Sequence, residues 1–217
     1  MKKPAALLII ICLVLFCCPL TAKENPRGNI TIKSFSKAKK AFKKIYKQHP
    51  VTFYCGCSFT NRDVNHGTCG YIPKRLLTKK SKKNKRAYRI EWEHVAPAHA
   101  FGQSFKEWRV GDPKCRGKKD RKCARKNREF AFMEADLYNL VPAIAEVNGN
   151  RSNYSMAMIP GEKRSYGACD VEIESRKVEP TESIRGNIAR TYMYMDWAYP
   201  GRGVISRKNR RLFKVVV

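Results

Sequence analysis

Two stretches decide the fold and point to a site: residues 90–98 (IEWEHVAPA) and residues 133–154 (MEADLYNLVPAIAEVNGNRSNY). The first marks the end of a strand, because residues 87–93 (AYRIEWE) are rich in strand-forming residues and a proline follows shortly after. Glu93 and His94 stand side by side here, with basic residues on both sides of the segment. A histidine base beside a metal-binding carboxylate, set among positive charges, suits phosphodiester hydrolysis.

The side-chain alternation of a strand limits how Glu93 and His94 can cooperate. Neighbouring side chains of a regular strand point to opposite faces, so these two share a site only where the strand ends or bulges. Pro97 favours an ending nearby. On a regular strand Glu91 shares the face of Glu93, and Trp92 shares the face of His94. We interpret Trp92 as a core residue.

Asn139 is the candidate ligand of the second stretch. We expect residues 130–146 to be largely helical, with an interruption near Pro142. Asparagine is mildly unfavourable inside a helix, which suggests a specific task for Asn139. Its carbonyl oxygen suits a hard cation such as Mg²⁺. The alternative is a buried amide that bridges backbone groups, and the sequence leaves both open.

The charge of the chain indicates an anionic partner. Lys and Arg number 45 against 18 Asp and Glu, which gives a formal net charge of +27. This argues against an ordinary cytosolic metabolic enzyme and leaves nucleic acid, an anionic membrane or an acidic glycan as partners. Nine of the sixteen residues 74–89 are basic. The basic residues that we predict to contact nucleic acid are Lys79, Lys80, Lys82, Lys83, Lys85, Arg86 and Arg89.

Residues 1–22 have the layout of a secretory signal peptide, with two lysines, the apolar run 5–16 and a small-residue cleavage site. The apolar run is short for a membrane span, which needs about 20 residues. We therefore expect cleavage, a periplasmic or secreted protein, and no stable membrane association. Residues 23–217 then form a single domain, because no repeat or low-complexity linker divides them.

The expected mature chain keeps six cysteines, an even number that favours disulfides in an exported protein. Cys115 and Cys123 bracket a short basic loop and are the best candidate pair. Cys55 and Cys57 lie two apart on a predicted strand over residues 51–59, so we expect them to take different partners. The remaining partners are Cys69 and Cys169, in an order that the sequence leaves open. No C-x-x-C pair supports a zinc site.

Other segments are predicted from their periodicity. Residues 34–48 read as an amphipathic helix with lysines on its outer face, capped by Ser34 or Ser36. We interpret it as a surface helix that packs on the core. Residues 184–195 also show helical spacing, residues 101–130 read as a long loop, and the residues from Gly201 onward read as a basic tail.

Residues 90–98, residues 121–123 (RKC) and residues 133–154 together resemble the secreted endonuclease I family of bacteria, a branch of the His-Me finger (ββα-metal) nucleases. The similarity runs over roughly residues 53–207. It implies an α+β fold with a small mixed or antiparallel sheet flanked by helices. The ββα-metal element would take one strand from residues 88–94 and its helix from residues 131–140.

The resemblance also implies roles for individual residues. His94 matches the general base, and Glu93 and Asn139 match the ligands of one divalent cation, most often Mg²⁺. Arg121, two residues before Cys123, matches the arginine that steadies the cleaved phosphate. The implied activity is sequence-nonspecific hydrolysis of DNA, and often of RNA, to 5′-phosphate products by a protein that we expect to be monomeric. Family members usually continue beyond the basic stretch at 210–213, so the domain looks shortened at its C-terminus.

Two other classes of function fit the charge alone. One is a catalytically inactive, basic nucleic-acid-binding protein, and the other is a cationic protein that acts on membranes or the cell envelope. A nuclease requires Glu93, His94 and a divalent metal, whereas a binding protein requires only the charge. Loss of activity in a His94 variant therefore separates a nuclease from these two other classes.

Overall fold

The two stretches quoted above form one strand–strand–helix unit. In the computed structural model, which describes residues 27–161 and 163–216, strand β3 (Ile90–His94) pairs antiparallel with β4 (Leu140–Ile144). The register runs from Ile90 opposite Ile144 to His94 opposite Leu140. Helix α6 (Ala145–Arg151) follows β4 without a break. The unit therefore brings the end of β3 next to α6, although the two elements are far apart in sequence.

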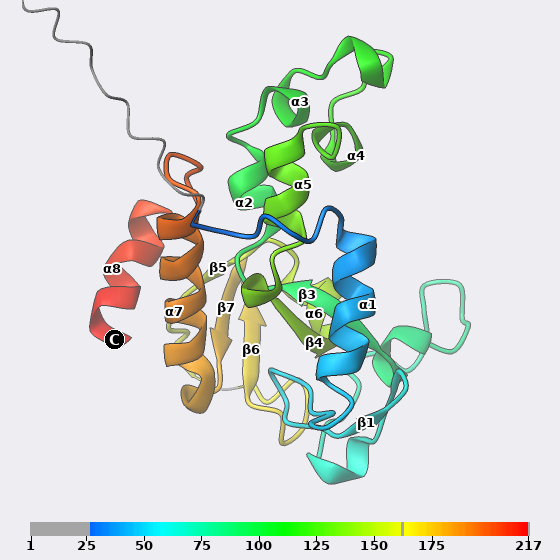
Figure 1. Cartoon of the computed structure of the whole chain (residues 1–217). Helices are drawn as coiled ribbons and strands as arrows, with labels where there is room; N and C mark the ends of the chain where they lie inside the picture. The colour runs from blue at the N-terminus through cyan, green and yellow to red at the C-terminus, as the bar shows by residue number, and fades with distance from the viewer. Residues whose placement is uncertain (1–26, 162, 217) are drawn as a thin grey trace, which may run out of the picture.

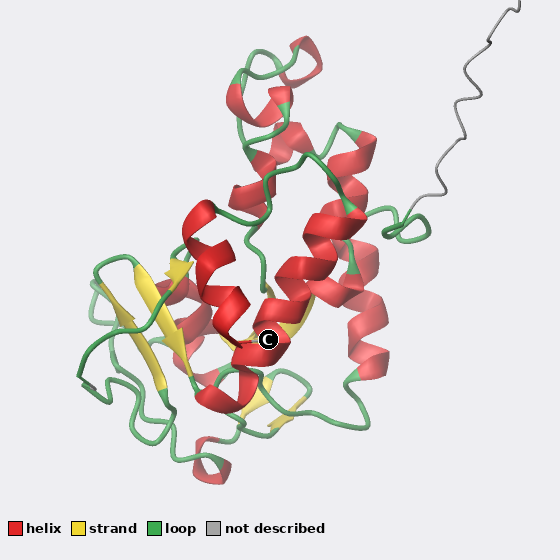
Figure 2. Ribbon diagram, turned by 90° about the vertical axis from the view of Figure 1, so that its left-hand side faces the viewer, coloured by secondary structure: helices red, strands yellow, loops and turns green. Residues whose placement is uncertain are grey.

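A second, mixed sheet carries the rest of the core. Its strand order is β5 (Ser155–Met156), β7 (Lys177–Pro180) and β6 (Val171–Glu174), with β5 parallel and β6 antiparallel to β7. Helix α7 (Glu182–Ala198) buries Ile188, Tyr192 and Met195 in the main hydrophobic cluster. Figures 1 and 2 show α7 and α8 side by side on one flank of the molecule and α1 on the other, with the strands between them.

The remaining elements are short. A two-residue hairpin joins β1 (Phe59–Thr60) to β2 (Asp63–Val64). The short helices α2 to α5 project together from one end of the molecule in Figure 1. The bounds of the short helices are α2 (Ala98–Gly102), α3 (Lys106–Arg109), α4 (Arg121–Ala124) and α5 (Arg128–Glu134), and those of the 3₁₀ turns are η1 (His66–Thr68), η2 (Lys85–Tyr88), η3 (Pro113–Cys115) and η4 (Leu137–Asn139).

The amphipathic helix near the N-terminus is present as predicted. Helix α1 (Phe35–Ile45) begins after Ser34, whose side chain accepts a hydrogen bond from the Lys37 amide. Ala38 and Phe42 are buried, and Phe42 packs on Trp92 with ring centroids 5.1 Å apart. Trp92 is thus a packing residue, as expected, and α1 is fixed against β3.

Three disulfides join the described cysteines. Cys115 pairs with Cys123, as expected. Cys55 pairs with Cys169 and Cys57 pairs with Cys69, so the two neighbouring cysteines do take different partners. The Cys55–Cys169 bond spans a sequence separation of 114 residues and thereby joins the segment before β1 to the segment before β6. A crosslink over such a distance lowers the entropy of the unfolded chain by a large amount.

Two segments differ from the predicted secondary structure near the site. Within residues 51–59 only Phe59 belongs to a strand, β1. Residues 51–58 form a tight loop closed by a bridge between Val51 and Ser58, because Gly56 adopts a left-handed conformation (φ +68°) that turns the chain. Residues 140–144 form β4 instead of the second half of a helix. This apolar run is buried throughout and has no periodicity that separates strand from helix, while Pro142 disfavours the helix.

Two further segments are more helical than the sequence suggested. The stretch 101–130 contains α3, η3 and α4 and the start of α5. The basic tail ends in α8 (Arg207–Val216), in which Asn209 and Phe213 are buried one turn apart. The sequence pattern did not predict this helix, because its buried face is narrow and many of its residues are charged. The expected α+β class, with small sheets, flanking helices and disulfides, is confirmed.

No helix among the described residues is long and apolar enough to cross a membrane. The predicted signal peptide, residues 1–22, lies outside the part of the chain that the structure describes.

Candidate active site

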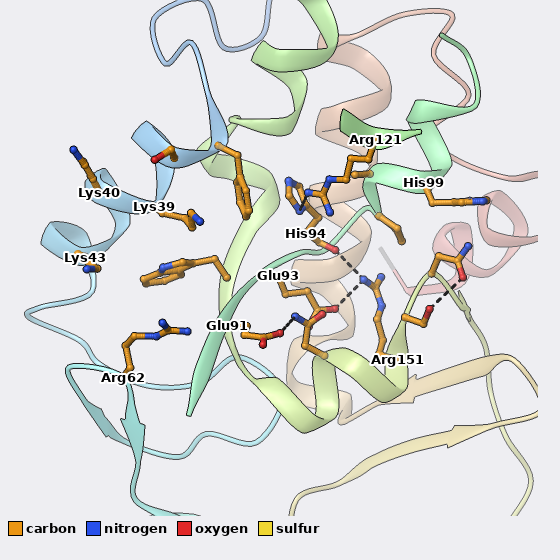
Figure 3. Close-up of a pocket in the computed structure, with 18 of the residues that line it drawn as sticks. Lys39, Lys40, Lys43, Arg62, Glu91, Glu93, His94, His99, Arg121 and Arg151 are labelled. Carbon is orange, nitrogen blue, oxygen red and sulfur yellow. Dashed lines mark hydrogen bonds and ion pairs between the residues drawn. The ribbon is translucent and has the colours of Figure 1, made fainter. Parts of the chain in front are cut away.

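An open pocket of about 800 Å³ lies at the end of β3, between α1 and α6 (Figure 3). Its walls carry six cationic side chains and two carboxylates. The lining residues that matter for the site are Lys39, Lys40, Lys43, Arg62, Glu91, Trp92, Glu93, His94, Arg121, Asn148 and Arg151. Three of the four residues predicted for catalysis and metal binding are therefore together: His94, Glu93 and Arg121.

His94 is held as a neutral base. Its Nε2 lies 2.8 Å from the backbone oxygen of Glu134, and because a carbonyl only accepts, Nε2 must carry the proton. Nδ1 is then the unprotonated nitrogen. Burial, followed by the nearby charge of Arg121, lowers the pKa of His94 to about 4. The ring also lies 4.9 Å from that of Phe35 of α1. The imidazole of His94 is thus neutral at neutral pH.

Arg121 lies next to the unprotonated Nδ1 of His94. It lies in the first turn of α4, and Asp120 before it caps that helix by accepting a hydrogen bond from the Cys123 amide. The Arg121 Nε donates to Glu134 Oε1 at 2.5 Å, and its Nη2 lies 3.5 Å from Nδ1 of His94. The Cys115–Cys123 disulfide holds the other side of this short helix.

Glu134 supports both groups. Its backbone oxygen orients the ring of His94, and its carboxylate, which is 1% exposed, binds Arg121 and Arg125. Burial alone would raise the pKa of Glu134, but the hydrogen bonds and charges of the two arginines lower it below the usual value. Glu134 stays ionised and keeps Arg121 beside His94.

Glu93 lies on the other side of β3 and is 2% exposed. Its Oε1 accepts from Tyr54 Oη at 3.0 Å and is 2.8 Å from Nη1 of Arg151. Arg151 also donates to the backbone oxygens of His94 and Val95, and so clamps α6 to the end of β3. The Glu93 Oε2 atom is buried and has no hydrogen-bond partner among the described residues.

β3 stays regular to its last residue, so Glu93 and His94 do point to opposite faces. They share the pocket because β3 ends at His94. The side-chain alternation of a strand requires such an ending, or a bulge, for a shared site. In Figure 3, Glu91, Glu93 and Arg151 lie together on the side of α6, while His94 and Arg121 lie together beside the strand end. The pocket wraps around the end of the strand.

The structure corrects the assignment of Asn139. This residue is 0% exposed; its Oδ1 accepts from the Ala96 amide at 2.7 Å, and its Nδ2 donates to the Ala96 oxygen at 2.9 Å. Both polar ends of the amide are used, and Asn139 does not line the pocket. It bridges backbone groups, which was the alternative interpretation. Asn148 of α6 lines the pocket instead, next to Glu91.

The pocket offers oxygen donors of the kind that bind a hard divalent cation. No group of three or more His, Cys, Asp or Glu side chains among residues 27–161 and 163–216 could hold a metal. The unpartnered Oε2 of Glu93 and the amide of Asn148 offer two oxygen donors in the pocket. Mg²⁺ is commonly bound through few protein oxygens and several waters. The residues present therefore fit such an ion.

The basic residues of the pocket are not those that the sequence pointed to. Lys39, Lys40 and Lys43 of α1 and Arg62 line it, whereas the predicted lysines of the basic loop, residues 74–86, lie outside it. The amphipathic pattern correctly predicted which face of α1 packs on the core. It did not show that the lysines of the other face would line the pocket. Arg86 and Arg89 form ion pairs with Glu91 at the pocket edge.

Sequence reasoning also missed Glu134, Asn148 and Arg151. Each lies within the second deciding stretch, and nothing in a single sequence separates them from solvated polar residues. A weak signal existed for Arg151, since a buried arginine needs a buried carboxylate partner and Glu93 was available.

A family model described as Endonuclease I matches residues 29–214. An extracellular deoxyribonuclease of Aeromonas hydrophila is 38% identical over 214 residues, which cover 95% of this chain and 83% of that protein. A periplasmic deoxyribonuclease of the same organism is 37% identical over 90% of this chain and 76% of its own length. Endonuclease-1 of Buchnera aphidicola subsp. Acyrthosiphon pisum is 40% identical over 85% and 70%, respectively. The chain therefore belongs to the endonuclease I family.

Proposed function

We propose that this chain is an exported, divalent-metal-dependent endonuclease that hydrolyses DNA without sequence preference and leaves 5′-phosphates. One observation carries the proposal: a neutral histidine base and a buried carboxylate with one unpartnered oxygen meet in a single cationic pocket. The deoxyribonucleases among its relatives support DNA as the substrate. RNA is a second expected substrate, because the proposed contacts are to the backbone.

His94 serves as the general base. Its Nδ1 takes a proton from the attacking water, while Nε2–H donates to the Glu134 oxygen and keeps the ring in the productive orientation. As the ring gains a proton, positive charge develops beside Arg121, but it also develops beside the ionised Glu134 carboxylate. The neutral resting state is thus favoured without preventing transient protonation.

Arg121 stabilises the charge on the phosphate. Its Nε is engaged by Glu134, which leaves its Nη atoms, one of them 3.5 Å from Nδ1 of His94, directed to the place where the water attacks. A guanidinium can donate to two phosphate oxygens at once. Arg121 therefore orients the phosphate against the base and neutralises the charge that builds on it.

Glu93 and Asn148 would hold the divalent cation, which we propose to be one Mg²⁺. When bound there, the ion would neutralise charge on the leaving 3′-oxygen. Burial raises the pKa of Glu93, although Arg151 opposes this effect, so an added cation would further stabilise the ionised carboxylate through its free oxygen. β3, β4 and α6 would then be the ββα-metal element, with its helix at 145–151 rather than 131–140.

The lysines of α1 and of the basic loop provide affinity for the DNA backbone through counterion release, which is independent of sequence. Export fits the three disulfides and the signal-like residues 1–22, and relatives carry the words extracellular and periplasmic in their names. We propose a secreted or periplasmic location, with a monomer as the active form.

The direct test is a plasmid assay. The chain, produced by export into an oxidising compartment, is incubated with supercoiled plasmid in Mg²⁺ or in EDTA, beside His94→Ala. We expect nicking that requires the metal and falls by about 10²–10⁴ in the variant. A folded protein that retards plasmid on a gel but never nicks it would identify the basic binding protein instead.

A further inference from the structure

Glu91 is a carboxylate of the pocket that the proposed mechanism does not use. It lies two residues before Glu93 on the same face of β3, and its side chain is 25% exposed. Three side chains surround its carboxylate: Arg86 Nη2 at 2.6 Å, Asn148 Nδ2 at 3.1 Å and Arg89 Nη2 at 3.5 Å. Both carboxylate oxygens of Glu91 therefore have partners from the chain itself.

The contact with Asn148 determines which end of that amide faces the pocket. An ionised carboxylate only accepts hydrogen bonds, so the amide must turn its NH₂ group to Glu91. The carbonyl oxygen of Asn148 then points away from Glu91. Asn148 lines the same pocket as Glu93, whose Oε2 has no partner among the described residues. If the amide were reversed, its NH₂ would face the cation and repel it.

Glu91 is itself held in place from outside the pocket. Arg86 reaches it by passing close to Gly149, the residue after Asn148, where an added Cβ would come within 2.5 Å of the guanidinium. Asn84, two residues before Arg86 in the basic loop, donates to the buried Glu146 carboxylate at 2.9 Å. The amides of Lys74 and Arg75, at the start of the loop, donate to the same carboxylate. The loop is thereby anchored beside Glu91.

We propose that Glu91 is a positioning residue for metal binding: through its hydrogen bond it fixes the Asn148 amide with the carbonyl oxygen toward the cation. Arg86 holds Glu91 in the orientation that this bond requires. The inference rests on the proposed function, because it takes Glu93 and Asn148 as the metal-holding pair. Residues that orient a ligand in this way commonly affect metal affinity by about 10- to 100-fold.

A binding measurement tests this without any activity assay. Mn²⁺, a spectroscopic substitute for Mg²⁺, is titrated into the exported chain, and free Mn²⁺ is followed by electron paramagnetic resonance. The variants are Glu91→Ala, Glu91→Gln, Asn148→Ala and the double variant Glu91→Ala/Asn148→Ala. Glu174→Ala is the matched control, since it removes an exposed carboxylate of β6 that pairs with Lys163. Circular dichroism confirms that each variant is folded.

We expect Glu91→Ala to weaken Mn²⁺ binding about tenfold and Glu174→Ala to have no effect. Because Glu91 acts through Asn148, the Glu91→Ala change should add nothing once Asn148 is alanine. Glu91→Gln should retain most of the affinity, since its carbonyl can accept the same hydrogen bond from Asn148. Should Glu91→Ala fail to fold, Glu91→Leu takes its place: it also lacks a hydrogen-bond acceptor but fills more of the space, and it should show the same loss of affinity.

Other outcomes overturn the proposal in distinct ways. Equal losses in Glu91→Ala and Glu91→Gln, additive with Asn148→Ala, would show a general effect of the negative charge. Unchanged affinity in Glu91→Ala, with a loss in Asn148→Ala, would overturn the positioning role and leave the proposed metal pair standing. A wild-type chain that binds no Mn²⁺ would overturn the metal pair, and the role of Glu91 with it.

Discussion

The two sides of the β3 end differ in chemistry although Glu93 and His94 are adjacent in sequence. On one side burial and the charge of Arg121 keep His94 neutral, a backbone carbonyl fixes its tautomer, and α1 borders the ring. On the other side Glu93 is buried in an ion pair with Arg151 and keeps one oxygen unpartnered, with the basic loop anchored nearby through Arg86 and Glu91. We refer to them as the base side and the carboxylate side.

The difference shows how one strand can place two kinds of ionisable group in one pocket. Strand alternation sends adjacent side chains to opposite faces, where each finds its own supporting residues. Burial lowers the pKa of His94 and raises that of Glu93, and in both cases it favours the neutral form. An arginine opposes burial only at Glu93. The fold therefore keeps the imidazole of His94 uncharged, whereas the Arg151 guanidinium works against protonation of Glu93.

Substitutions at Glu93 and His94 should give the largest contrast. His94→Ala should lower kcat by about 10²–10⁴ and leave the affinity for Mn²⁺ unchanged. Glu93→Gln should remove Mn²⁺ binding and also cost about 3–5 kcal/mol of stability, because Arg151 becomes a buried charge without its counterion. Mn²⁺ titration and urea unfolding measure both quantities. Loss of Mn²⁺ binding in His94→Ala would mean that the imidazole is itself a ligand.

The two asparagines of the second stretch provide the next contrast. Asn139→Ala should destabilise the fold by about 2–4 kcal/mol, because it leaves the buried amide and carbonyl of Ala96 without partners. Asn148→Ala should change stability by less than about 1 kcal/mol, since Asn148 is half-buried, but should weaken metal binding. The reverse pattern, a stable Asn139→Ala without metal affinity, would restore Asn139 as the ligand.

The pH dependence of activity and of stability should show how far the base side shields His94 from protonation. With a pKa of about 4 in the fold against an ordinary 6.5, His94 remains a competent base well below pH 6. The unfolded chain takes up this proton first, so stability is lost as the pH falls from 6.5 to about 4. We expect kcat/KM at saturating Mg²⁺ to hold until the pH nears 4. A fall centred near the ordinary pKa of 6.5 would mean that His94 is not shielded as described.

Removing lysines from α1 or from the basic loop should have the smallest effect of these changes, and the effect should be on the salt dependence of DNA binding. The triple change Lys39, Lys40 and Lys43 to Ala removes charge that lines the pocket on the base side. The triple change Lys79, Lys80 and Lys82 to Ala removes charge from the basic loop, which lies outside the pocket. The first should reduce the slope of log K against log salt by up to about 0.9 for each phosphate that the protein no longer neutralises. The loop variant should reduce it less. Equal reductions would place the DNA path across α1 and the basic loop alike.

Local patterns in the sequence were sufficient for several features. The spacing of apolar residues and the Ser34 cap predicted α1, and the even cysteine count predicted disulfides, including Cys115–Cys123. The motif around Glu93 and His94 predicted a strand end, and that strand does end at His94. These features depend on neighbours within a few residues, which a single sequence displays directly.

The tertiary structure decided the rest, because it depends on contacts between distant segments. Asn139 and Asn148 are both polar residues of one stretch. Only the pairing of β3 with β4 buries Asn139 against Ala96 and places Asn148 in the wall of the pocket. The partners of Glu93 and His94, Arg151 and Glu134, lie 58 and 40 residues further along the chain. Their burial sets the charge of each group, and burial exists only after the chain has folded.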